Sequence, residues 1–406
     1  MPLPRFRQVE VFPLKVEDKT MICLRDPEGV LDEAVLVSSS AFFVASLLDG
    51  KREALDIQVA FARKFAGHLL LESEIGAVVK ELDERGFLDN DSYALRRAEA
   101  VNRFSQSAVR PFSHAGLSYS ADAEVINRII ANFLTDSVDA GSSPEGGDGR
   151  LPLGLVVPHI DFERGGAVYA SAYRRVVDRE LPPLVVVLGV AHSAPPSPFT
   201  LTRKNFDTPL GVVSTDSGAV DELVARCGPW LLDHEFAHKG EHSIEFQLIW
   251  LKALRPADNF RILPVLCSPF DLFCGSEGPM SNDRIAGFLG ALKEVAGGRE
   301  VLFIASVDFS HVGPKFGMDI KLDSAVEAWM KERDMSLLGA VESGDEAAFW
   351  ALGMEKGNET NVDALSAVYS LMKLVSPAKG KILAYDKASD PAGGIVSFAS
   401  LEFGRP

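Results

Sequence analysis

Residues 184–192, LVVVLGVAH, form an apolar, largely β-branched run that ends at a histidine. The same pattern occurs at 153–159 (LGLVVPH) and at 301–311 (VLFIASVDFSH). An apolar run without alternation is typical of a strand that is buried on both faces of a sheet. We therefore predict strands at 153–157, 184–188, 262–266 and 301–305.

Helical patterns lie between or after these strands, at 168–179, 243–254, 283–295 and 322–332. This alternation predicts an α/β domain with a central, largely parallel sheet and flanking helices. The segments at 381–385 and 395–403 are expected to add antiparallel strands at the C-terminal end.

The N-terminal part has a different pattern. Two short strand-like pieces precede three helical stretches, and Ile75, Val78, Val79 and Leu82 have the spacing of one helix face. We predict a small α+β, winged-helix-like accessory domain over 1–95, a helical connector over 96–111 and the α/β domain over 112–406. Within the α/β domain, the Gly- and Ser-rich segment at about 137–150 predicts a flexible loop.

Composition limits the classes of partner and the cellular location. There are 57 acidic and 41 basic residues, giving a net charge of −16, which argues against nucleic acid as a partner. No apolar run reaches the roughly 18 residues of a membrane span. The N-terminus lacks the apolar core of a signal peptide, so we expect a cytoplasmic protein. The four cysteines form no CxxC pair, which disfavours a disulfide scaffold or a thiolate zinc site.

Histidines stand where three predicted elements end or begin. His159 and His192 follow the first two strands, and His242 opens the helix at 243–254. Asp308 and His311 follow the strand at 301–305. Ligands of open α/β sheets bind outside the carboxyl ends of the strands. We therefore predict one shared site, with His242, Asp308 and His311 as its catalytic residues.

Neutral imidazoles suit iron, copper, zinc and nickel, and two histidines with one carboxylate are the usual ferrous arrangement. His159 and His192 as metal ligands leave His242 free as an acid or base. Asp308 could instead orient a histidine. The identity of the third ligand stays open among four side chains: Asp308, Ser310, His311 and Cys267.

A second motif, DFERGG at 161–166, follows the first histidine and opens a helix. Its glycines permit either a close approach of the backbone to a ligand or a tight turn. We expect Asp161, Arg164 and Gly165, together with Glu241 beside His242, to contact a substrate.

These motifs resemble one family. PHIDF (158–162), LGVAH (188–192), TPLG (208–211), EHSIE (241–245) and DFSH (308–311) occur in the order and approximate spacing of Memo-like proteins. The resemblance covers about 112–403. The family is also named AmmeMemoRadiSam system protein B and is similar in fold to class III extradiol ring-cleavage dioxygenases.

The resemblance implies that His159 and His192 are the metal ligands and that His242 is the acid/base histidine. Ser310 stands where animal Memo proteins have a cysteine and the dioxygenases have a glutamate ligand. A neutral hydroxyl is a poor ligand for ferrous iron, so the resemblance does not transfer ring cleavage to this chain.

The resemblance also implies two partners, a radical-SAM enzyme and an AMMECR1-like protein. LDGKR (48–52) and ERGFL (84–88) loosely resemble PqqD-like modules, which bind leader peptides. We predict a metal-dependent redox enzyme, using iron or copper with zinc not excluded, that acts on a small molecule or peptide. The alternative is a non-catalytic scaffold subunit with a vestigial site and no metal.

Overall fold

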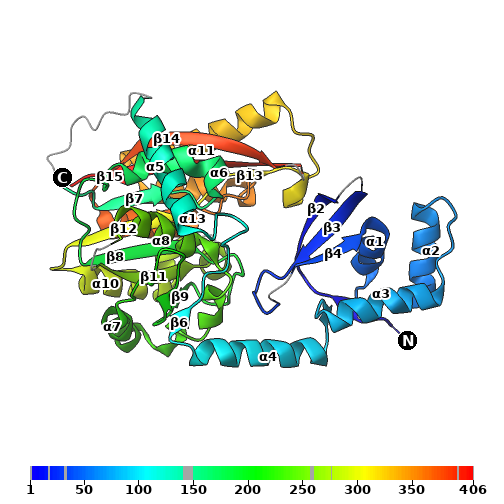
Figure 1. Cartoon of the computed structure of the whole chain (residues 1–406). Helices are drawn as coiled ribbons and strands as arrows, with labels where there is room; N and C mark the ends of the chain where they lie inside the picture. The colour runs from blue at the N-terminus through cyan, green and yellow to red at the C-terminus, as the bar shows by residue number, and fades with distance from the viewer. Residues whose placement is uncertain are drawn as a thin grey trace. The chain divides into compact units, whose positions relative to one another are not determined.

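The computed structural model describes residues 2–16, 19–31, 34–139, 150–256, 260–275, 277–390 and 393–405. The chain divides into two compact units, Met1–Ser107 and Ala108–Pro406, which are described one at a time below (Figure 1). Residues 140–149 of the predicted loop lie outside the described residues. No helix in the described ranges is long and apolar enough to cross a bilayer.

The first unit combines a small antiparallel sheet with helices. Its strands β2 (Glu10–Val16), β3 (Lys19–Arg25) and β4 (Val35–Ser38) pair in that order, and β1 (Arg5–Phe6) pairs with β5 (Leu88–Asp89). The helices are α1 (Ser39–Leu47), α2 (Ala54–Lys64), α3 (Glu72–Glu84) and α4 (Asp91–Gln106). The α+β character is as predicted, and the winged-helix classification stays a prediction.

Within its described residues, the second unit contains an eight-stranded sheet. Its centre is parallel and runs β7 (Gly154–Val157), β12 (Val301–Ser306), β8 (Leu184–Val190) and β11 (Arg261–Cys267). These are the four predicted strands. Antiparallel strands flank them: β9 (Phe199–Leu201), β13 (His311–Val312), β14 (Gly380–Asp390) and β15 (Gly394–Phe403).

The sheet is therefore mixed, and the prediction of a largely parallel sheet holds only for its centre. The physical reason is burial. Every residue of β8 is buried, whereas β14 is mostly half-buried or exposed and lies at the margin, where an antiparallel hairpin with β15 suffices.

Helices cover both faces of this sheet (Figure 1). Val185 and Val187 of β8 contribute to one core and Val186 and Leu188 to the other, as the alternation of a strand requires. One face carries α5 (Ala123–Asp139), α6 (Phe162–Tyr173) and α8 (His242–Leu254). The other carries α7 (Ser217–Cys227), α10 (Asp283–Ala296), α11 (Ser324–Ser343), α12 (Glu346–Met354) and α13 (Leu365–Val375), with the short α9 (Asp271–Cys274) nearby.

One predicted helix begins earlier than expected. The sequence predicts a helix at 168–179, but α6 begins at Phe162 because the Asp161 side chain caps its first turn by accepting from the Arg164 amide. The DFERGG motif is thus the start of a helix that leads directly out of the β7 strand end.

Candidate functional site

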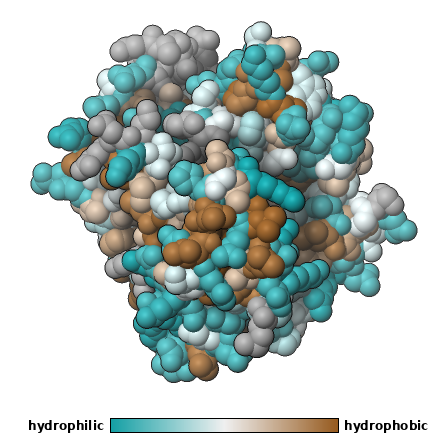
Figure 2. Space-filling view, turned by 90° about the vertical axis from the view of Figure 1, so that its right-hand side faces the viewer, coloured by the Kyte–Doolittle hydropathy of each residue, from teal (hydrophilic) through white to brown (hydrophobic). Residues whose placement is uncertain are grey.

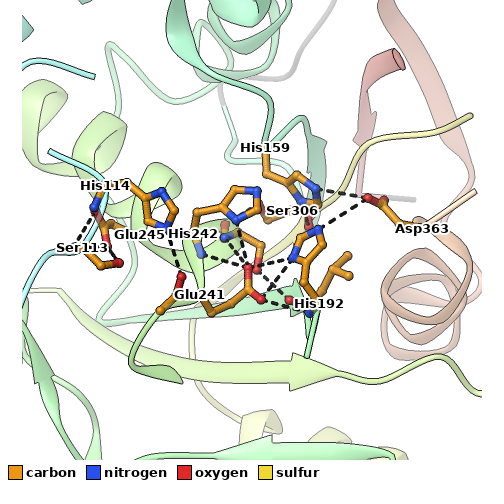
Figure 3. A network of polar contacts seen from close by, with 12 residues as sticks. Ser113, His114, His159, His192, Glu241, His242, Glu245, Ser306 and Asp363 are labelled. Atoms are coloured by element: carbon orange, nitrogen blue, oxygen red, sulfur yellow. Dashed lines mark hydrogen bonds and ion pairs between the residues drawn. The ribbon is translucent and has the colours of Figure 1, made fainter. Parts of the chain in front are cut away.

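Three imidazoles meet at the carboxyl ends of the central strands. His159 follows β7, His192 follows β8 and His242 is the first residue of α8. Their ring centroids lie 5.0 Å (159–192), 5.0 Å (159–242) and 4.6 Å (192–242) apart. One nitrogen from each ring falls within 4.8 Å of the others, a group able to hold a metal ion (Figure 3). The predicted meeting of these three rings is confirmed.

Hydrogen bonds fix which nitrogen each strand-end imidazole presents. The Nδ1 atom of His159 lies 3.0 Å from the Ser306 carbonyl oxygen, and that of His192 lies 3.0 Å from Glu241 Oε1. Both partners are acceptors only, so Nδ1 carries the proton in each ring and donates it. Each Nε2 therefore faces the site, and in the neutral ring it carries the lone pair with which a metal-binding histidine coordinates.

Glu241 links the β8 strand end to the start of α8. Its carboxylate accepts from the backbone amides of His192 at 3.0 Å, His242 at 2.9 Å and Ser243 at 2.9 Å, in addition to the His192 ring. Its side chain is only 5% exposed. The sequence predicted contact with a substrate; the structure shows both carboxylate oxygens holding the histidines in place.

Burial and neighbouring charges shift the pKa values of the three histidines in different directions. Burial lowers the pKa of His192, but the Glu241 carboxylate outweighs it and the pKa is raised. Burial and the neighbouring His192 hold the pKa of His242 well below its usual range. Burial also opposes protonation of His159, yet the Asp363 and Asp308 carboxylates raise its pKa to about 10. His242 is therefore the ring that stays neutral.

Asp363 is a site residue that the sequence analysis missed. Its Oδ2 atom lies 3.1 Å from Nε2 of His159, 4.0 Å from Nε2 of His192 and 3.9 Å from Nε2 of His311. Its Oδ1 atom accepts from the Asp308 amide at 2.9 Å. It precedes α13, which was not predicted, and no buried strand leads into it. An aspartate shortly before an apolar helix was the only available signal.

Asp308 and His311 adjoin this group. The Asp308 carboxylate accepts from the His159 amide at 3.1 Å, and its Oδ2 atom lies 3.9 Å from the His159 Nε2. The ring Nδ1 of His311 lies 3.1 Å from the Phe309 carbonyl oxygen and 3.2 Å from that of Asn361. His311 lies in β13 (His311–Val312), which pairs with β15.

Ser310 and Cys267 are buried away from solvent. The Ser310 hydroxyl donates to Asp334 Oδ1 at 2.6 Å, and its amide donates to the Ser397 hydroxyl at 2.9 Å. Burial raises the pKa of the Cys267 thiol, which favours its neutral form. The Ser310 hydroxyl is therefore hydrogen-bonded to a carboxylate. The role of Ser310 as a metal ligand stays a prediction.

The α6 motif is built for packing and capping. A Cβ atom on Gly165 would lie 2.4 Å from Cγ2 of Ile160, and the Gly165 amide donates to the Asp161 carbonyl oxygen at 2.9 Å. The glycine thus permits close packing, and its amide is used within the helix. The Arg164 guanidinium pairs with the Asp161 carboxylate and is partly exposed. Substrate contact by these residues stays a prediction.

Two further histidines lie close to the site or in the core. The His114 ring centroid is 5.2 Å from that of His242, and its Nε2 lies 2.9 Å from the Gly240 carbonyl oxygen. His238 is buried, and its Nε2 donates to the Thr200 carbonyl oxygen at 3.1 Å. Sequence position alone did not distinguish these rings from surface histidines.

Comparison with known proteins identifies the family. A family model described as Memo-like protein matches residues 110–401, close to the predicted 112–403. A MEMO1 family protein of Aquifex aeolicus is 32% identical over 386 residues, covering 94% of this chain and 95% of its own. A MEMO1 family protein of Thermus thermophilus is 30% identical, and the match covers 79% of this chain and 89% of that protein. A MEMO1 family protein of Methanopyrus kandleri is also 30% identical, and the match covers 72% of this chain and 97% of that protein. The chain therefore belongs to the Memo-like protein family.

Proposed function

We propose that this protein binds a divalent transition metal through His159 and His192 and acts in the cytoplasm as a metal-dependent redox enzyme. Iron or copper is the metal that we favour, with zinc not excluded. The observation that supports this is the pair of imidazoles whose Nδ1 protons are held by Ser306 and Glu241. Both Nε2 atoms are then available to one ion.

A metal held by these two histidines would supply redox and Lewis-acid chemistry. We assign proton transfer to His242, because its ring adjoins both other imidazoles and stays neutral in the resting site. Glu241 holds the strand end at His192 next to the first turn of α8, because its carboxylate accepts from the His192 and Ser243 amides. The proposed relationship of the family to extradiol dioxygenases favours a small-molecule or peptide substrate.

Metal analysis tests this proposal. We expect the purified protein to take up about one equivalent of Co²⁺ or Cu²⁺, and His159→Ala and His192→Ala to lose it. Chelation should abolish any turnover. Substoichiometric metal that neither substitution changes would overturn the proposal and favour the alternative, a scaffold subunit with a vestigial site.

We further propose a peptide partner, within the radical-SAM pathway with an AMMECR1-like protein that the family resemblance implies. This unit has a pocket of about 410 Å³ whose apolar lining includes Val44, Phe61, Phe65 and Leu69. Leu69 is 84% exposed. Hydrophobic side chains also gather on the face of the molecule drawn in Figure 2.

An apolar pocket suits the side chain of a bound peptide. Titration with peptides encoded near the gene should show saturable binding that Phe65→Ser weakens. If none of these peptides binds, the peptide-binding proposal is refuted and the first unit has only a packing role.

A further inference from the structure

The Asp363 carboxylate points into the group of imidazoles from a separate element. Figure 3 shows it turned toward His159 and His192. Among the described residues, its buried Oδ2 atom has no hydrogen bond of normal geometry, although three imidazole Nε2 atoms lie within 4.0 Å of it. A buried carboxylate is costly unless a cation balances it, and the cation here is either the protonated His159 ring at 3.1 Å or a metal ion that takes the place of its proton.

The distances around this oxygen match those between ligands of one ion. With metal–ligand bonds of about 2.1 Å, neighbouring ligand atoms lie about 3.0 Å apart at right angles and about 3.4 Å apart at the tetrahedral angle. Oδ2 of Asp363 is 3.1 Å from Nε2 of His159 and 4.0 Å from Nε2 of His192, which brackets the tetrahedral spacing. Both Nε2 atoms are the ones that the Nδ1 hydrogen bonds leave free.

The other oxygen ligands considered are less well placed. Asp308 Oδ1 accepts from the His159 amide, and its Oδ2 atom is 3.9 Å from the His159 Nε2. The Ser310 hydroxyl donates to Asp334. Asp363 alone among these three binds backbone through one oxygen and turns the other toward both strand-end imidazoles.

We propose that Asp363 is the third protein ligand of the metal, its Oδ2 completing a two-histidine, one-carboxylate set with Nε2 of His159 and His192. This inference rests on the proposed function. Such a set with open positions is the arrangement that ferrous iron uses in oxygenases. Asp363 would thus provide the carboxylate ligand that Ser310 cannot provide.

The test is Co²⁺ binding by the full-length protein, because Co²⁺ is stable in air and its visible spectrum reports coordination. The variants are Asp363→Asn and, as the matched control, Asp308→Asn. Asparagine keeps an Oδ1 acceptor for the Asp308 amide, so Asp363→Asn should fold, and circular dichroism checks this. We expect Asp363→Asn to weaken Co²⁺ binding by about 100-fold or more, since loss of an outer partner already costs about 10–100-fold. Asp308→Asn should lose less.

Two results would overturn the assignment. One is an Asp363→Asn affinity within about tenfold of the unmodified protein; the other is a larger loss in Asp308→Asn than in Asp363→Asn. A Co²⁺-soaked crystal of the unmodified protein gives an independent check, with the ion expected about 2.0–2.2 Å from Asp363 Oδ2. An ion held by the two histidines but more than about 3 Å from this oxygen would also overturn it.

The two proposals fail differently. If the unmodified protein takes up no Co²⁺, or if His159→Ala and His192→Ala bind it normally, the metal site itself is refuted. If those variants lose the metal while Asp363→Asn retains it, only the assignment of Asp363 is refuted.

Discussion

Breaking the buried Arg110–Glu245 ion pair should strongly destabilise the second unit. Arg110 belongs to β6 (Val109–Arg110), and both side chains are almost completely buried. The guanidinium also donates to the carbonyl oxygens of His238 at 2.9 Å and Glu241 at 2.6 Å. Glu245 lies one turn after His242, so this pair ties the start of α8 to the segment that precedes the domain core.

The Glu245 carboxylate has further partners on the same segment. It accepts from the amides of Ser113 and His114, each at 3.0 Å, and from the Tyr119 hydroxyl at 2.5 Å. Arg110→Met would leave this carboxylate charged and buried without its partner. Glu245→Gln would leave the Arg110 guanidinium charged and buried in the same way. Loss of one partner of a buried pair costs about 3–5 kcal/mol.

The double variant Arg110→Met/Glu245→Gln should cost less than the sum of the two single changes. It leaves no buried charge, and the glutamine oxygen still accepts from the backbone amides. We expect a coupling free energy of about 1–3 kcal/mol. This difference, rather than either single loss, is the signature of a charge pair.

Urea unfolding followed by tryptophan fluorescence measures this directly. All four tryptophans lie in the second unit, at Trp230, Trp250, Trp329 and Trp350. The signal therefore reports the free energy of unfolding of that unit without a contribution from the first. Single losses below about 1 kcal/mol, or additivity within about 0.5 kcal/mol, would refute the reasoning.

Three further predictions concern single positions. Glu241→Gln should weaken Co²⁺ binding by about 10–100-fold in a titration, because it removes the carboxylate that orients the imidazole after β8; unchanged affinity would contradict that role. Burial lowers the pKa of His238 to about 3. Its stabilising contribution is therefore complete above about pH 6.5 and falls by about 1.4 kcal/mol per pH unit below it. In urea unfolding at pH 7 and pH 5, His238→Gln should flatten this decline, and an equally steep decline would argue against a buried neutral ring. Gly189→Ala should cost about 1–3 kcal/mol, because its Cβ would lie 2.5 Å from the Ser243 hydroxyl oxygen. The control Gly339→Ala, in α11 with no atom within 4 Å of its Cβ, should be neutral or stabilising, and equal losses in both variants would contradict the packing argument.

Local pattern was enough to predict the centre of the fold and part of the site. Strands buried on both faces need continuous apolar runs, so β7, β8, β11 and β12 could be read directly from the sequence. Parallel strands place their carboxyl ends at one edge, so the residues that follow them had to be neighbours. That reasoning brought His159 and His192 together, and the start of a predicted helix added His242.

The rest depended on contacts that no local pattern encodes. Asp363, Arg110 and His114 follow no predicted buried strand, and each reaches the site or its support through partners more than 50 residues away in the chain. Strand direction and periodicity are local properties, so the gathering of imidazoles at one edge of a sheet can be predicted from the pattern of residues. Which carboxylate faces these rings, and which nitrogen each ring presents, depends on hydrogen bonds between distant segments that form when the helices pack.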